Sequence, residues 1–248
     1  MKRLLLLAAS AVLAAPSLAG TPSINVGAMY EYAAPGQGAL LKRVRNTGNA
    51  TAFVRVEIAE VRYGPDGKAT EVPVDTARVD GQGNALIASP SRLIVPAQGQ
   101  QATRLLFQGD RSAERYYRVR FVPVMPKRED EFALTDAEAD DYRKGLLAGV
   151  NVLTGYGVFV IVHPDGTTYD TRVDASDAQT VVRNAGNTTV VLDDVRQCGI
   201  DGKAESCSPP RRIHLLPQRV ETFSHGPGQT HRFEIVEGDA RKRVLLNP

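Results

Sequence analysis

A basic segment is the part of this sequence whose side chains could bind an anion. The stretch ERYYRVRFVP, which starts at Glu114, alternates in the manner of a β-strand, where successive side chains point to opposite faces. One face would carry the guanidinium groups of Arg118 and Arg120. The other would be apolar, with Tyr117, Val119 and Phe121. Guanidinium groups bind carboxylates through paired hydrogen bonds, so this strand is a candidate carboxylate site.

A lysine on an earlier predicted strand is a second candidate. Lys42 shares its strand parity with Leu40 and Val44, so its ammonium group would point toward the core face. A charged group in that position needs a partner, and an anion held in a cleft would be one. Simple exposure of each basic side chain to solvent is the alternative interpretation.

Catalytic and metal-binding patterns are absent from the sequence. The four histidines form no close metal-binding spacing such as HExxH, and there is no GxSxG, phosphate-binding loop or dinucleotide motif. The pairs Asp140-Asp141 and Asp193-Asp194 are adjacent, so on strands their carboxylates would point to opposite faces. We therefore expect a protein that is not an enzyme and that uses no metal or other cofactor.

The first residues have the pattern of an export signal. Lys2 and Arg3 precede an apolar run, residues 4–15, that is too short to span a bilayer. We expect removal of residues 1–19 after Ala19, and a retained membrane anchor is the alternative. Removal would take away Lys2 and Arg3, two of the 30 basic residues. The 28 that remain equal the acidic residues in number, so the net charge of the shortened chain would be zero. A neutral chain gives no reason to expect binding to nucleic acid.

Both cysteines stand in CGIDGKAESC, with an Asp-Gly pair near the middle. Asp-Gly favours a tight hairpin turn, which would bring Cys198 and Cys207 to facing strand positions. In an exported protein the expected state of this pair is a disulfide. A metal site is the rival interpretation, but two cysteines without a nearby histidine make a poor zinc site.

A turn that occurs twice predicts the domain organisation. VRNTGNATAFV starts at Val44 and VRNAGNTTVV starts at Val182, about one domain length later. We expect two domains of similar construction, residues 20–164 and 165–248. A favourable turn sequence that occurs twice by chance is the alternative.

Short alternating segments between turns rich in Gly and Pro predict an all-β fold of two β-sandwiches. The expected strands are 24–32, 39–45, 52–63, 86–88, 92–95, 101–107, 115–122, 151–162, 168–173, 180–183, 188–196, 211–216, 220–224, 231–236 and 243–246. Residues 124–149 are charged and poor in β-branched side chains, so we expect a loop there with room for a short helix around 136–147.

The last strand of the first domain is apolar on both faces. In GVNVLTGYGVFVIVHP, which starts at Gly149, one face has the even-numbered positions 150–162, and the other has Leu153, Phe159 and Ile161. An antiparallel strand with one buried face needs apolar side chains on that face only. An edge strand that offers its spare side chains to another protein would explain the pattern. A central strand buried on both faces is the alternative.

These segments resemble the periplasmic chaperones of the fimbrial chaperone–usher pathway, in particular the alternate clade that serves common-pilus and cable-type fimbriae. The similarity covers nearly the whole chain after residue 19. It rests on SPSRLIVPAQGQQATRLLF, ERYYRVRF, GYGVFVIVHP, NAGNTTV and the cysteine hairpin. The resemblance implies two immunoglobulin-like sandwiches in an L or boomerang arrangement, and a periplasmic location.

The resemblance also implies a mechanism. In this family the chaperone lends the last strand of its first domain to a pilin subunit that lacks one, and an outer-membrane usher then receives the complex. Pilin subunits and an usher are therefore the expected partners, with no nucleic acid and no membrane insertion, and self-association of the free form stays open. Counting back from Pro164 places the donated side chains at Val150, Val152, Thr154 and Tyr156.

The family anchors the C-terminal carboxylate of the pilin in the cleft between the domains. Its better-known members use an arginine on the first strand and a lysine on the last, and this sequence has neither. The hypothesis is that Lys42 and Arg118 replace them, with Arg45 and Arg120 as further candidates. Other possible functions are a structural protein of the pilin or adhesin type and a periplasmic binding module, but the full strand count of both domains favours the chaperone.

Overall fold

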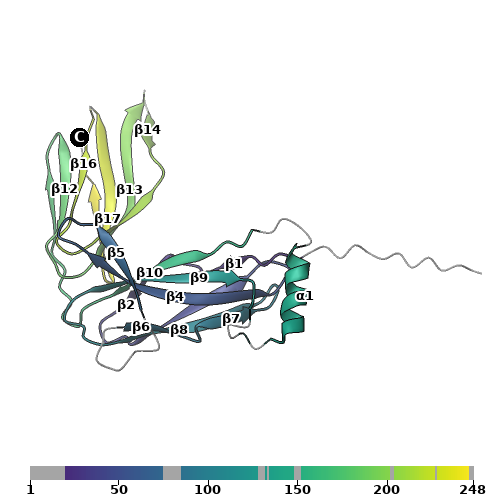
Figure 1. The fold of residues 1–248 in the computed structure, drawn as a ribbon. Coiled ribbons are helices and arrows are strands. Elements are labelled where there is room, and N and C mark those ends of the chain that lie inside the picture. Colours follow the sequence, from purple (N-terminus) through teal and green to yellow (C-terminus); the bar gives the residue numbers. More distant parts are fainter. Residues whose placement is uncertain are drawn as a thin grey trace, which may run out of the picture.

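A computed structural model describes residues 20–74, 85–127, 132, 134–147, 152–201, 204–226 and 228–245. The expected export signal and Val150 lie outside the described residues. Figure 1 shows two β-sandwiches, the second rising from one end of the first, with a single labelled helix at the opposite end. The predicted all-β fold of two sandwiches is confirmed.

Two sheets form the first sandwich. Sheet A has the strand order β1-β3-β8-β6, and sheet B has the order β2-β10-β9-β4-β5 with β7 paired to β4. The strands are β1 (Ile24–Asn25), β2 (Tyr30–Ala33), β3 (Ala39–Asn46), β4 (Ala52–Tyr63), β5 (Ala69–Pro73), β6 (Ala85–Ser89), β7 (Arg92–Val95), β8 (Gln100–Gln108), β9 (Arg115–Val124) and β10 (Tyr156–Val162). Alternate side chains from both sheets meet in one core, which includes Leu86, Leu105, Tyr117 and Phe121.

The second sandwich is smaller. Sheet C has the order β11-β12-β16, and sheet D has the order β14-β13-β17-β18 with β15 paired to β13. The strands are β11 (Thr171–Ala175), β12 (Gln179–Asn184), β13 (Val190–Asp201), β14 (Ala204–Cys207), β15 (Arg211–Leu215), β16 (Val220–Ser224), β17 (Gln229–Glu237) and β18 (Ala240–Leu245). The core includes Val182, Leu192 and Phe233. Cys198 and Cys207 are paired in register and joined by the predicted disulfide.

Helix α1 (Asp136–Leu147) forms where the sequence predicts one. Thr135 caps its start, because its hydroxyl accepts a hydrogen bond from the Glu138 main-chain N–H at 3.3 Å and its own N–H donates to the Glu138 carboxylate at 2.8 Å. The ring of Tyr142 packs against Phe53, and its hydroxyl donates to the Thr51 carbonyl oxygen at 2.7 Å. The helix is therefore fastened to the far end of the first sandwich. Within the part of the chain that the structure describes, no helix is long and apolar enough to cross a membrane.

Two expected strands differ clearly from the observed ones, and one observed strand was not expected. The segment expected at 24–32 is two strands in different sheets, β1 and β2, and Gly27 between them has a φ of 70°, which suits glycine. The strand expected at 151–162 begins only at Tyr156. Strand β5 was not predicted, because every one of its residues is exposed and it therefore lacks an alternating apolar pattern.

The repeated turn carries the chain from one sheet to the other in both sandwiches. It starts at Asn46, which ends β3, and at Asn184, which ends β12, and both side chains are fully buried. The Asn46 amide donates to the carbonyl oxygens of Ala50 and Val95 at 2.7 and 3.1 Å. The Asn184 amide makes the equivalent bonds to Thr188 and Leu215 at 2.8 and 2.9 Å. Each amide thus hydrogen-bonds one carbonyl group of its own turn and one of a neighbouring strand.

A glutamine completes each copy of this turn. Gln98 and Gln218 have φ values of 56° and 61°, and their side-chain amides donate to the carbonyl oxygens of Gly48 and Gly186. A side chain at Gly48 would place its Cβ 2.1 Å from the Thr21 carbonyl oxygen, so only glycine fits there. Two separate segments therefore build the same turn in both domains.

A buried carboxylate joins the two sandwiches. Glu114, just before β9, has a side chain that is only 2% exposed. It accepts hydrogen bonds from the Thr188 hydroxyl at 2.6 Å, from the Thr189 main-chain N–H at 2.7 Å and from the Thr189 hydroxyl at 2.5 Å. His163 lies 3.9 Å away, and burial lowers the pKa of its imidazole, which favours the neutral form. One part of the junction is thus a buried anion held by donors from the second domain.

The buried turn can be tested through Asn46. Replacing Asn46 with Ala removes the amide that satisfies two buried carbonyl groups, and we expect the free energy of unfolding to fall by about 2–4 kcal/mol. Urea denaturation followed by circular dichroism measures this change. Gln101→Ala, at an exposed position on β8, is the matched control and should stay within about 0.5 kcal/mol of wild type. Equal effects of the two substitutions would contradict the role given to Asn46.

The junction can be tested through Glu114. In Glu114→Ala each core is intact but the domains lose their charged contact, and charged hydrogen bonds contribute about 1.5–3 kcal/mol each. We expect limited proteolysis between residues 163 and 171 to become at least about tenfold faster. Glu57→Ala, which removes a carboxylate paired with Arg55 on an exposed face, should leave the rate unchanged. An unchanged rate in Glu114→Ala would show that other contacts hold the junction.

Candidate functional site

Strand β10 has one open edge. It pairs with β9 along its whole length, but with β2 only from Phe159 onward. The Phe159 N–H donates to the Met29 carbonyl oxygen at 2.8 Å. Because main-chain groups alternate between the two sides of a strand, those of Gly157 face the same side as those of Phe159. Among the described residues no strand pairs with Gly157 on that side, so this part of the edge is available to another strand.

The chain just before β10 continues this open edge. Residues 152–155 belong to no strand, and the Val152 side chain is 75% exposed. Of the four predicted donor residues, Val152 and Thr154 face solvent, and Val150 lies outside the described residues. Tyr156 instead packs against the core of the first sandwich. Residues 152–155 are therefore an exposed segment outside any strand, whereas Tyr156 begins a strand whose alternate side chains pack into the first sandwich.

The second apolar face of β10 is used in the junction between the domains. Phe159 and Ile161 point away from the core of the first sandwich and pack with Val61 in a separate cluster. Tyr32, Tyr63 and Tyr116 pack against this cluster. Tyr32 also reaches the second domain, because its hydroxyl hydrogen-bonds Nδ1 of His214. Apolar residues on both faces of β10 are therefore explained by two packed surfaces.

Arg118 lies beside this aromatic cluster. Its guanidinium carbon is 5.1 Å from the centre of the Phe159 ring, and its Nε is 3.6 Å from a Glu71 carboxylate oxygen. Arg120 pairs with the same carboxylate at 2.5 Å and lowers the pKa of Glu71. A Cβ at Gly157 would lie 3.2 Å from the Arg118 Cδ atom, so the missing side chain leaves room for Arg118 to extend across β10.

The structure does not bring the four predicted anchor residues together. Lys42 is 3% exposed, and its ammonium group donates to a Glu31 carboxylate oxygen and to the Ala28 carbonyl oxygen, both at 2.6 Å. It points into the first sandwich, whereas Arg118 and Arg120 lie on the outer face of sheet B. Arg45 is exposed on sheet A. The sequence could not reveal Glu31 as the partner of Lys42, because the two lie on strands of different sheets.

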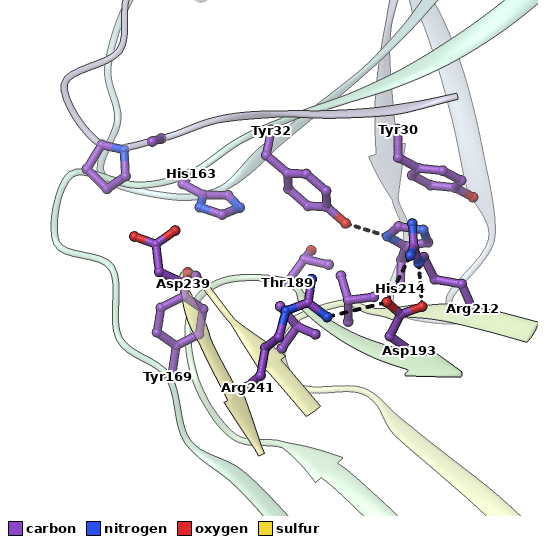
Figure 2. A pocket seen from close by; sticks show the side chains of 15 residues that line it. Tyr30, Tyr32, His163, Tyr169, Thr189, Asp193, Arg212, His214, Asp239 and Arg241 are labelled. Carbon is purple, nitrogen blue, oxygen red and sulfur yellow. Dashed lines mark hydrogen bonds and ion pairs between the residues drawn. The ribbon is translucent and has the colours of Figure 1, made fainter. Parts of the chain in front are cut away.

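Residues of both domains line a pocket of about 480 Å³. Figure 2 shows its labelled side chains, with Tyr30 and Tyr32 of the first domain facing His214 and Arg212 of the second. Tyr30 of the first domain stacks on His214 of the second, with ring centres 3.6 Å apart. Burial and the nearby Arg212 lower the pKa of His214 to about 4, so the ring is neutral at pH 7, and its Nδ1 shares a hydrogen bond with the Tyr32 hydroxyl. Arg212 is paired with Asp193 at 2.8 Å. Sequence reasoning missed this pocket, since its two walls are far apart in the chain.

The described residues hold no group of three His, Cys, Asp or Glu side chains that could bind a metal ion. The polar groups of the pocket are largely paired with one another, as the bonds from Tyr32 and Arg212 show. The geometry therefore favours a binding surface. Its parts are an open strand edge, an exposed apolar segment before it, and an arginine beside an aromatic cluster.

Comparison with known proteins agrees with this arrangement. No protein-family profile matches the chain. It is 22% identical to "Probable fimbrial chaperone EcpB" of Escherichia coli O157:H7 over 249 residues, which cover 99% of this chain and 95% of that protein. It is also 27% identical to a CS1 fimbrial protein of Escherichia coli over 159 residues. That match covers 64% of this chain and spans 61% of the length of that relative.

Solved structures share the fold. The class 5 fimbriae chaperone CfaA superposes with a TM-score of 0.54 at 16% identity, over 91% of this chain and all of that one. The CsuC–CsuE chaperone–tip adhesion subunit complex of Acinetobacter baumannii matches with a TM-score of 0.50 at 13% identity, over 90% of this chain and 97% of that one. The chain is thus similar along its full length to a fimbrial chaperone, and it shares the two-sandwich fold of the solved fimbrial chaperones.

Proposed function

We propose that this chaperone caps a fimbrial subunit and does so by lending it the open edge of β10 and the segment before it. The observation that carries the proposal is that β10 lacks a second neighbour before Phe159, while the adjoining Val152 side chain is 75% exposed. An added strand would satisfy the free main-chain groups, and alternate side chains would fill apolar sites of the fimbrial protein. The chain thus acts by binding and not by catalysis.

The end of β2 limits where a client strand could lie. Strand β2 runs parallel to β10 and occupies the edge from Phe159 onward. A client strand that runs in the same direction would have to stop near Met29, which comes just before β2. Its C-terminal carboxylate would then lie near Phe159. Of the four predicted anchor residues, Arg118 is the one in contact with that ring.

We assign the carboxylate contact to Arg118 and a structural role to Lys42. Arg118 is about one-third exposed and shares Glu71 with Arg120, so it can turn toward a new carboxylate at little cost. Lys42 is buried and neutralised by Glu31, so a client carboxylate would have to displace an existing ion pair. Arg120 and Arg45 remain weaker candidates, because neither contacts the Phe159 ring that we place at the end of the client strand.

Strand donation predicts that Val152→Asp abolishes client binding. A carboxylate at this position would have to enter an apolar site of the client without a partner, which costs several kcal/mol. We expect the amount of fimbrial subunit that co-purifies with the tagged chaperone from periplasm to fall at least about tenfold. Leu147→Asp is the matched control, since Leu147 is an exposed apolar residue on α1, 66% exposed, and should leave recovery unchanged. Wild-type recovery with Val152→Asp would exclude strand donation by this segment.

The anchor predicts a smaller effect for Arg118→Ala. Loss of one charge-assisted hydrogen bond weakens binding by about 1.5–3 kcal/mol, or roughly 10- to 100-fold in the dissociation constant. Titration of the chaperone with a client truncated by one C-terminal residue provides a second measurement. If Arg118 binds the carboxylate, truncation should weaken wild type and hardly affect Arg118→Ala. Arg55→Ala, on the same sheet, is the control and should behave as wild type. Independent losses from truncation and from Arg118→Ala would place the anchor elsewhere.

A further inference from the structure

Sheet A contains no carboxylate. Its strands β1, β3, β6 and β8 include four basic residues and neither Asp nor Glu. Lys42 is the one that points inward to Glu31. The other three, Arg43, Arg45 and Arg104, are exposed on the outer face of the sheet. This face, which we call the arginine face, is therefore uniformly positive.

The three arginines occupy neighbouring positions on two paired strands. Arg104 is opposite Leu41, and Arg43 is opposite Ala102, so Arg43 and Arg104 are diagonal neighbours on adjacent strands. Such neighbours are about 7–8 Å apart, and like charges at this distance repel each other. Arg45 follows Arg43 on the same face. Within the described parts of the chain, none of the three makes an ion pair or a side-chain hydrogen bond.

Several arginines elsewhere in the first domain are paired with carboxylates. On sheet B, Arg62 and Arg115 both pair with Glu60, and Arg120 pairs with Glu71. The second domain shows the same pattern, with Arg172–Asp170, Arg196–Asp194 and Arg243–Glu234 pairs. Arg183 on β12 also lacks a carboxylate partner among the described residues, but sheet A differs in presenting three such arginines on one face.

Apolar side chains lie among these charges. Leu41 is 55% exposed, and Ile87 and Leu106 beside it are partly exposed. A groove of about 300 Å³ adjoins the face, between β3 and residues 25–28; its wall includes Leu41, Arg43 and Arg45 together with the ion-paired Lys42 and Glu31. Arginine around an exposed apolar centre is a composition typical of protein interfaces.

We propose that the arginine face is a docking surface for an acidic segment of a partner protein. Three positive groups without internal partners provide the charge complementarity, and Leu41 provides the apolar contact. Sheets A and B enclose one core, so this face lies on the opposite side of the sandwich from Arg118 and the aromatic cluster. The partner can therefore bind while a fimbrial subunit occupies the open edge. The proposal goes beyond client capture, because it adds a second, independent surface.

The test compares two triple variants that lose the same charge. The first is Arg43→Gln, Arg45→Gln and Arg104→Gln, and the control is Arg172→Gln, Arg196→Gln and Arg243→Gln in the second domain. The probe is a fluorescein-labelled peptide of four Glu-Glu-Leu repeats, with a Ser-Ser-Leu peptide as its neutral counterpart. We expect the face variant to bind the acidic peptide at least about tenfold more weakly than wild type, and the control variant to bind within about twofold. Equal losses in both variants would overturn the proposal.

A second measurement separates this surface from client capture. In cells that express a fimbrial subunit, the face variant should retain wild-type client recovery from the periplasm while fewer client molecules reach the cell surface. Reduced recovery would place the arginine face within the client site and overturn the proposal.

Tighter binding to phosphatidylglycerol vesicles than to the peptide would overturn the proposal and identify a lipid surface as the partner. A dimer of wild type that the face variant loses, measured by sedimentation, would identify a second copy of the chain as the occupant. The two proposals fail in different experiments: wild-type client recovery with Val152→Asp would overturn strand donation, whereas the arginine-face variants test only the arginine face.

Discussion

The buried carboxylate of Glu114 is the interaction on which the arrangement of the binding surface depends. It sits at the start of β9 and is held by Thr188 and Thr189 of the second domain. A buried charge is tolerated only when donors surround it, so the second domain has one favourable position relative to the first. That position brings His214 against Tyr30 and Tyr32 and encloses the pocket between the domains. Without the carboxylate, each sandwich would keep its core but the cleft would lose its fixed shape.

Local sequence patterns were sufficient for most of the fold. Alternation marked the long strands, the Asp-Gly pair located the cysteine hairpin, and the Thr135 cap agrees with the predicted start of α1. Strand prediction failed where the sequence pattern of a segment does not match its pairing in the folded protein. Strand β5 is fully exposed, and the first strand changes sheets at Gly27. The segment at 152–155 has the alternation of a strand, but β2 and β9 offer it no paired neighbour.

The candidate site was less predictable, because the role of each charged side chain depends on which opposite charge lies beside it. Parity correctly indicated that Lys42 points inward, but the sequence could not show that Glu31 neutralises it. Parity also placed Arg118 and Arg120 on one face, and the structure adds the shared Glu71 and the Phe159 ring. These partners come from strands that are distant in sequence. These ion pairs can be predicted only once the strand order is known, and neither composition nor residue spacing gives that order.

The chain between Tyr142 and His163, which includes β10, contacts one copy of the repeated turn at each of its ends. Upstream, the Tyr142 hydroxyl binds the Thr51 carbonyl at the end of the first copy. Downstream, His163 lies beside Glu114, which binds the second copy at Thr188 and Thr189. The length of chain between Tyr142 and His163 is therefore set by two fixed points. Under the proposed strand donation, inserting or deleting one residue there would exchange the side chains that this segment offers to a client, while both sandwiches would stay folded. Evolution of a new client specificity should thus change side chains in this segment and preserve its length.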